Sequence, residues 1–276
     1  METHRISGFL TSRLKNFLVN RQLCSHLQNK RRFSKSDRIS FISQIKLLIY
    51  IRNLGKMALI LGYWNIRGRG GVLRNLLDYC EIPFENHVYK TDEEWFDKDK
   101  KELPVPFPNI PYIKDGDQIL TEVLALMNYV AIKAGRKDLI GDTDEKHIKV
   151  LQGISVINDL REPLKSLCWT KGNFYAEKEE LFTKGKAKNL LEGFNKVYDK
   201  NEWLTGFFSI ADFWLFEQVD LIFELEKSRL EEYPNLLKFH QRFLEIPKVQ
   251  AHRASDHFIT TWFLPGKATW TKPGDK

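Results

Sequence analysis

The chain has 276 residues, of which 42% are hydrophobic and 29% are charged, as in an ordinary globular protein of one large or two modest domains. Its formal net charge of +7 is unevenly spread. Residues 1–56 hold 12 Lys and Arg against two acidic residues, whereas the remainder holds 31 basic and 34 acidic residues. The body therefore gives no reason to expect a nucleic-acid partner. Three widely spaced cysteines form no metal-ligand pattern, so no metal is expected.

Residues 1–56 form a basic, amphipathic extension. Apolar residues recur at helical spacing over 9–18 and again over 41–49, interspersed with Arg, Lys and Ser. This composition is typical of a mitochondrial transit peptide, so the mitochondrion is the expected location and the cytoplasm the alternative. Three other interpretations stay open: a disordered tail, a retained arm that contacts a membrane surface or a larger complex, and sequence upstream of a true start at Met57.

The first half of the body, residues 57–138, alternates strand and helix signals. An Asp115-Gly116 turn between two short apolar runs predicts a β-hairpin. The predicted elements are a strand over 58–64, a helix over 72–81, a strand over 84–89, a charged segment over 92–102, strands over 112–114 and 118–121, and a helix over 123–134. This β-α-β-α-β-β-α order predicts a thioredoxin-like domain.

The second half, residues 143–276, shows helix signals only and follows a polar linker over 137–143. Pro163 is expected to bend or break the first helix, and Ser209 with Asp212 forms a capping-box pattern at the start of a later one. Helices are predicted over 144–169, 176–199, 209–226, 234–244 and 247–254. The expected architecture is thus an α/β thioredoxin-like domain followed by an all-α domain.

Tyr63 stands at the carboxyl end of the first predicted strand, the sheet edge at which ligands bind in open α/β folds. A phenol there can donate a hydrogen bond to a sulfur and favour the thiolate, which is the nucleophilic form of a thiol. The alternative is an aromatic side chain at a strand end with no chemical role.

The turn Asn109-Ile110-Pro111-Tyr112 precedes the hairpin. A proline directly before a strand favours a cis peptide bond, which leaves the backbone N–H and C=O of Ile110 free to pair with an extended peptide. A trans proline that ends a loop is the alternative.

The glycine-rich segment 67–71 (Arg-Gly-Arg-Gly-Gly) matches neither the Walker nor the dinucleotide-binding spacing. It is therefore interpreted as a flexible loop between the first strand and the first helix.

Four motifs, taken in order, resemble the mu-class glutathione transferases and their helminth relatives: Leu61–Gly68 (LGYWNIRG), Phe107–Tyr112 (FPNIPY), Asp115-Gly116 and Ser209–Asp212 (SIAD). The resemblance runs from Met57 to about Trp270. It implies a dimeric transferase that uses reduced glutathione as co-substrate and small hydrophobic electrophiles as acceptors.

The resemblance also implies a role for individual residues. Tyr63 corresponds to the tyrosine that stabilises the glutathione thiolate, and Asp159 to the acidic residue that reaches the glutathione of the partner subunit. Trp169 falls in the electrophile pocket. The other implied glutathione contacts are Trp64, Trp95, Lys100, Asn109, Ile110 and Pro111.

The sequence departs from the family at the γ-glutamyl end of the site. The usual Gln-Ser pair reads Glu122-Val123, and valine cannot donate the hydroxyl hydrogen bond, which is worth about 0.5–1.5 kcal/mol. An arginine that the family carries before Trp95 is also missing, and Asp92 lies there instead. Weaker glutathione binding is expected. The alternative function is a non-catalytic structural subunit of a larger, mitochondrial assembly.

Overall fold

The computed structural model describes residues 58–271. The expectations for the extension, residues 1–56, and for Met57 lie outside this range. Within the described range no helix is long and apolar enough to cross a membrane.

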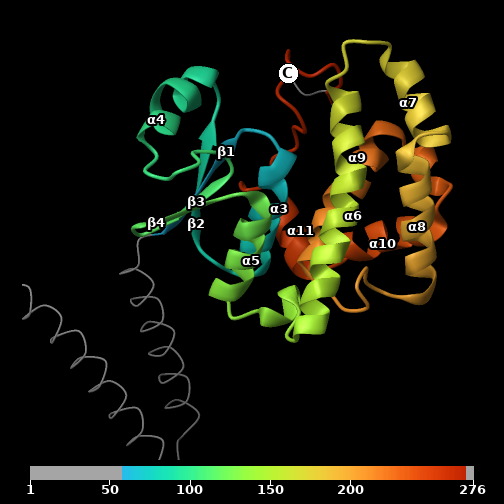
Figure 1. Cartoon of the computed structure of the whole chain (residues 1–276), viewed down its shortest axis with the longest axis horizontal. Helices are drawn as coiled ribbons and strands as arrows, with labels where there is room; N and C mark the ends of the chain where they lie inside the picture. The colour runs from blue at the N-terminus through green and yellow to red at the C-terminus, as the bar shows by residue number, and fades with distance from the viewer. Residues whose placement is uncertain (1–57, 272–276) are drawn as a thin grey trace, which may run out of the picture. The chain divides into compact units, whose positions relative to one another are not determined.

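A four-stranded mixed sheet forms the centre of the first domain (Figure 1). Its strands are β1 (Leu59–Trp64), β2 (Phe84–Tyr89), β3 (Tyr112–Asp115) and β4 (Gln118–Thr121), in the spatial order β2-β1-β3-β4. β1 runs parallel to β2, with Tyr63 opposite Val88, and antiparallel to β3. β3 and β4 form the predicted hairpin. The thioredoxin-like fold is confirmed.

Two helices, α3 (Gly68–Tyr79) and α5 (Val123–Lys133), lie between the sheet and the helical domain, whereas the short α4 (Lys100–Glu102) lies on the other side of the sheet (Figure 1). A wide helical turn, η1 (Glu93–Asp99), leads into α4. α3 begins at Gly68, four residues before its predicted start. The prediction of a flexible loop over 67–71 was therefore wrong.

The second domain is all-helical, as predicted, and consists of α6 (Asp144–Cys168), α7 (Phe174–Thr183), α8 (Lys186–Lys200), α9 (Ile210–Glu231), α10 (Pro234–Leu244) and α11 (Pro247–Arg253). A short turn, η2 (Lys137–Ile140), precedes it. Pro163 lies inside α6 and does not break it; the whole helix is 25 residues long. The helix predicted over 176–199 is two helices, because the chain turns at Gly185, where a Cβ atom would lie 2.9 Å from the backbone of Leu181.

The start of α9 carries the predicted capping box. Asp212 accepts a hydrogen bond from the backbone N–H of Ser209 (2.9 Å), and the Ser209 hydroxyl accepts one from Ala211. α9 also extends past its predicted end at residue 226, where Glu226 has non-helical backbone angles that mark a kink. The buried face of α9 packs against α6 and α3, which joins the two domains through one continuous hydrophobic core.

Candidate active site

Tyr63 lies at the carboxyl end of β1, beside the start of α3. Its side chain is 7% exposed, and its hydroxyl oxygen accepts a hydrogen bond from the backbone N–H of Arg69 (3.1 Å). The amino end of a helix carries partial positive charge from its unpaired N–H groups. The phenol oxygen is therefore held where negative charge is stabilised.

Two glycines in the first turn of α3 make room for the tyrosine ring. A Cβ atom on Gly68 would lie 2.7 Å from Tyr63 Oη, and one on Gly70 would lie 2.4 Å from Tyr63 Cδ1. Gly68 also has a positive φ of 40°, a conformation that side chains disfavour. The glycines thus allow close packing around Tyr63, and this requirement explains why residues of low helix propensity occupy the first turn of α3.

Arg74 of α3 stabilises the turn between β1 and α3 through hydrogen bonds. Its guanidinium donates to the carbonyls of Ile66 (2.7 Å) and Trp64 (3.0 Å) and to the side-chain oxygen of Asn86 (2.9 Å). Burial lowers the pKa of Arg74 to about 10. No signal in the sequence marked this residue, because Arg74 lies beside, and not on, the apolar stripe of the predicted helix.

Arg67 was interpreted as part of the flexible loop, but its side chain is buried and joins the two domains. It pairs with Glu217 (3.0 Å) and Asp220 (2.6 Å) on α9, and its guanidinium lies 3.6 Å from the ring centroid of Trp262. Burial works to lower the pKa of Arg67, but the two carboxylates outweigh it and raise that pKa. Asp220 also binds His240 (2.8 Å). This ion network therefore holds the connection between β1 and α3 against the helical domain.

The Ile110–Pro111 peptide bond is cis, as predicted. The Ile110 N–H is not free, however, because it donates to the side-chain oxygen of Asn109 (2.9 Å). Asn109 in turn donates to the Glu122 carboxylate (3.0 Å). Glu122 has a positive φ of 71°, which directs its side chain toward this turn from the residue before α5. The structure thus brings Asn109, Ile110 and Glu122 together, with Val123 next to them as the first residue of α5.

The two tryptophans assigned to the glutathione pocket differ in exposure. Trp64 is half-buried and packs against Tyr89 and Phe96. Trp95 is 2% exposed and lies in the second core of the first domain, with its ring stacked on Tyr112. Lys100 is exposed, and its ammonium group lies 5.2 Å from the Phe96 ring centroid.

Asp159 lies on α6, and Trp169 directly follows the carboxyl end of that helix. Asp159 is exposed and binds Lys186 of α8 (2.8 Å). Trp169 is 39% exposed and packs edge-on against Phe263, with 6.2 Å between ring centroids. Phe263 belongs to the C-terminal segment that covers the start of α3, so the structure places Trp169 near the Tyr63 side of the molecule and Asp159 on the α6–α8 face.

A narrow cavity of about 20 Å³ opens beside Tyr63. Gly68 forms part of its wall, and Trp262 and Phe263 form another part. A Cβ atom added to Gly68 would lie 2.7 Å from the tyrosine hydroxyl. The remaining lining residues are Arg161, Lys165, Glu217, Gln218 and Leu221.

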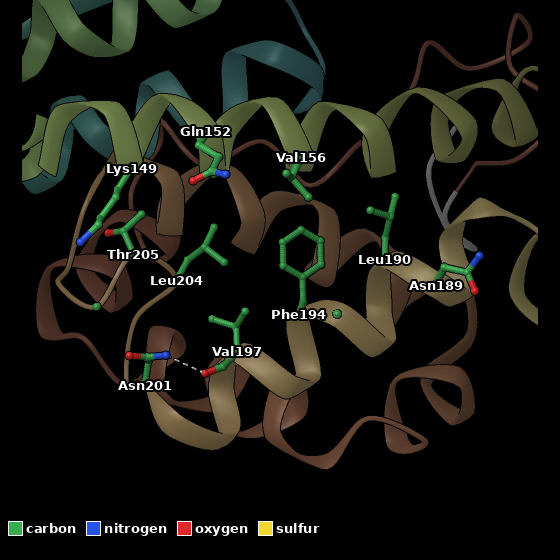
Figure 2. A pocket seen from close by; sticks show the side chains of 13 residues that line it. Lys149, Gln152, Val156, Asn189, Leu190, Phe194, Val197, Asn201, Leu204 and Thr205 are labelled. Carbon is green, nitrogen blue, oxygen red and sulfur yellow. Dashed lines mark hydrogen bonds between the residues drawn. The ribbon is translucent and has the colours of Figure 1, made fainter. Parts of the chain in front are cut away.

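A larger hollow of about 530 Å³ lies away from Tyr63, between α6, α8 and the loop after α8. Figure 2 shows that side chains of α6 and α8 face each other across it. Val156, Leu190 and Phe194 give it an apolar floor, and Lys149, Gln152, Asn189, Asn201 and Thr205 lie around them. None of these residues belongs to the cavity beside Tyr63, so the two hollows are separate features.

Known proteins share both halves of this fold. The family model described as glutathione S-transferase, N-terminal domain, matches residues 60–132, and the glutathione S-transferase C-terminal domain matches residues 158–256. A class-mu 26 kDa glutathione S-transferase isozyme of Fasciola hepatica is 36% identical over 214 residues, which cover 75% of this chain and 90% of the relative. Glutathione S-transferase Mu 6 of Mus musculus is 32% identical over 223 residues, covering 78% and 99%.

Solved structures agree with the sequence comparison. The glutathione S-transferase Blo t 8 superposes with a TM-score of 0.63 at 25% identity, covering 72% of this chain and 93% of that one. The fold is a thioredoxin-like domain followed by an all-helical domain, and each of the two matches one of the family models. The chain belongs to the glutathione S-transferase family, a family of transferases.

Proposed function

We propose that this protein conjugates reduced glutathione to small hydrophobic electrophiles and that Tyr63 stabilises the glutathione thiolate. The observation that carries the proposal is the hydrogen bond from the Arg69 N–H to the Tyr63 oxygen. Because the oxygen already accepts this bond, its own proton is available to donate to a sulfur on the open side. A hydrogen bond to a charged group is worth about 1.5–3 kcal/mol, enough to bring the pKa of a thiol from about 8.5 to near 7.

The reaction that follows is a nucleophilic substitution or addition. The thiol proton leaves to solvent, the thiolate sulfur forms a bond to the electrophilic carbon, and any leaving group departs with its bonding electrons. Tyr63 keeps its proton throughout and acts by hydrogen bonding. The C-terminal aromatic residues and Trp169 would hold the electrophile close to the sulfur, and this proximity supplies much of the rate.

The rest of the glutathione molecule is assigned to the turn beside β3. We assign its cysteinyl backbone to Asn109, Ile110 and Pro111, and its γ-glutamyl end to Glu122 and Val123. For the peptide to pair with Ile110, it must replace the internal hydrogen bond that the Ile110 N–H donates to the Asn109 side-chain oxygen. Trp64 and Trp95 are assigned to the lining of the glutathione pocket, and Lys100 is assigned as the cation for the glycyl carboxylate.

We further propose that two copies of the chain form a dimer through Phe107 and the α6–α8 hollow. Phe107 is 80% exposed, an unusual state for a large apolar side chain on a loop. The hollow has a matching apolar floor and room for a phenyl ring. In a two-fold dimer each subunit would supply one Phe107 and one hollow. Asp159 lies one turn beyond Val156 on the same face of α6, which places it to approach the partner's glutathione.

The test of the activity is Tyr63→Phe in the full chain. We expect kcat/KM for glutathione and an aryl chloride to fall at least tenfold, and the midpoint of the pH–rate profile to rise toward the free-thiol value of about 8.5. Tyr129→Phe is the matched control, because Tyr129 donates to Asp115 at a distance from this site. Its activity should stay within twofold.

The opposite outcome would support the alternative function. If the wild-type protein neither binds nor turns over glutathione at millimolar concentration, the enzyme assignment is wrong. A non-catalytic structural subunit would then be the better interpretation of Glu122 and Val123.

For the dimer, Phe107→Ser should shift the sedimenting species toward a monomer, whereas a monomeric wild-type protein would contradict that proposal.

A further inference from the structure

Three cations share one carboxylate next to Tyr63. Glu162, on α6, binds Arg161 (2.6 Å) and Lys165 (2.5 Å), and Arg69 of α3 approaches it to 3.9 Å. One negative charge therefore faces three positive charges, which leaves an excess of two positive charges at this place.

Two carboxylates close to the cluster are already paired with other cations. Glu217 also lines the cavity, but it is already paired with the buried Arg67 at 3.0 Å. Asp159, on the preceding turn of α6, is paired with Lys186. Burial and the neighbouring Arg69 charge both lower the pKa of Arg161, which is the direction expected for an under-neutralised guanidinium.

Arg161 differs from an ordinary surface cation. Its side chain is 12% exposed, and its guanidinium lies 5.5 Å from the ring centroid of Trp214. Exposed ion pairs contribute only about 0–1 kcal/mol, because water competes for both partners. A cation held near an aromatic wall and largely shielded from water attracts an anion more strongly.

The cation cluster, made of Arg69, Arg161 and Lys165 around Glu162, lies beside the start of α3, where Tyr63 is held. Gly68 lines the cavity together with Arg161 and Lys165, and a Cβ atom added to this glycine would lie 2.7 Å from the tyrosine hydroxyl. The backbone N–H of Arg69 is the group that donates to Tyr63. The cavity volume of about 20 Å³ admits one small polar group rather than a whole aromatic ring. An anionic substituent in the cavity would leave the body of the molecule outside it.

We propose that the electrophile conjugated at this site carries an anionic substituent such as a carboxylate, which Arg161, Lys165 and Arg69 bind while the thiolate attacks. This inference rests on the proposed transferase function and specifies its substrate class. The same cations would also raise the local concentration of anionic substrates by electrostatic attraction, an effect that salt weakens.

The test compares two electrophiles of similar shape in the full chain: 4-chloro-3-nitrobenzoate and its methyl ester. In both, the sulfur–carbon bond forms at the ring carbon that loses chloride. Each kcat/KM is divided by the uncatalysed rate constant for the same compound, because the ester is intrinsically more reactive. We expect the corrected ratio of acid to ester to be about ten or more for the wild-type protein, and to decline with increasing NaCl.

Variants then locate the effect. Arg161→Met and Arg69→Met should each lower the acid-to-ester ratio about fivefold or more, and Arg161→Lys should keep most of it. A general loss of activity cancels in the ratio, and Arg69 is 42% exposed, so its replacement does not endanger the fold. Lys146→Met is the matched control, because Lys146 of α6 forms the same kind of exposed ion pair, with Asp142 just before the helix, and takes no part in the cavity. Its ratio should be unchanged.

The outcomes separate the inference from the proposed function. If the ester is turned over and the corrected ratio is one or lower, the substrate class is wrong and the transferase activity stands. If the ratio is high but neither Arg161→Met nor Arg69→Met lowers it, the cluster is not the anion site and the inference also fails. If neither compound is turned over and glutathione is not bound, the proposed function fails and the inference falls with it.

Discussion

The proposed sulfur end and the proposed γ-glutamyl end of the site are built in different ways. At the sulfur end, Tyr63 is buried, its oxygen is held by a backbone N–H, and its ring is enclosed by two glycines. At the other end, the contacts belong to side chains, namely the Asn109–Glu122 hydrogen bond and the half-buried Val123. Backbone packing makes the first arrangement hard to change without disturbing the fold. A single side-chain replacement is enough to change the second.

The largest effect is expected from disturbing the backbone packing at the sulfur end. Gly70→Ala would bring a Cβ atom to 2.4 Å from the Tyr63 ring, so the ring must shift. A misplacement of about 1 Å lowers the rate about a hundredfold, and we expect kcat to fall by that order. A Gly70→Ala enzyme with kcat within threefold of wild type would show that the ring position is not constrained.

A side-chain change at the other end should improve the enzyme. Val123→Ser restores a hydroxyl at the start of α5, and one hydrogen bond of about 0.5–1.5 kcal/mol should lower the KM for glutathione about three- to tenfold. Val123→Ala separates the hydroxyl from the loss of bulk and should leave KM unchanged or higher. Steady-state kinetics at saturating electrophile measures both. Equal KM values for the serine and alanine variants would place the γ-glutamyl group elsewhere.

Asp159 tests whether the γ-glutamyl end extends across a dimer. Asp159→Asn should raise the KM for glutathione about two- to fivefold with little change in kcat, because an amide replaces a carboxylate in the contact with an amine. Lys186→Met removes the cation that holds Asp159 within its own chain, so it should leave KM unchanged or lower it. A rise in KM for Lys186→Met alone would indicate that Lys186, rather than Asp159, contacts the peptide.

The smallest effect is expected at Glu122. Glu122→Gln keeps an oxygen that accepts the hydrogen bond from Asn109 and removes the negative charge near the γ-glutamyl carboxylate. We expect KM to fall by less than threefold, and the change to be smaller at high salt, since the group is exposed to solvent. A large increase in KM would mean that Glu122 binds the γ-glutamyl amine as a charged partner.

Local patterns carried most of the successful predictions. The Asp115-Gly116 turn, the capping box at Ser209 and the cis-proline at Pro111 each depend on a few neighbouring residues, and each is present in the structure. Predictions that relied on helix propensity alone were less accurate. Pro163 does not break α6, and the glycines after Arg67 lie within a helix, because tertiary contacts outweighed the local preference.

The sequence by itself determined the class of protein, the two-domain order and the position of Tyr63 at the end of a strand, because these follow from short motifs and the period of apolar residues. Only the tertiary structure decided what surrounds that tyrosine. Arg67 binds Glu217, 150 residues away in the chain, and Arg69 meets Glu162 only because α3 and α6 approach each other. Contacts between charges so distant in sequence leave no local pattern. Arg161, Glu162 and Lys165 are neighbours on α6, but their position beside Arg69 and Tyr63 became visible only in the folded chain.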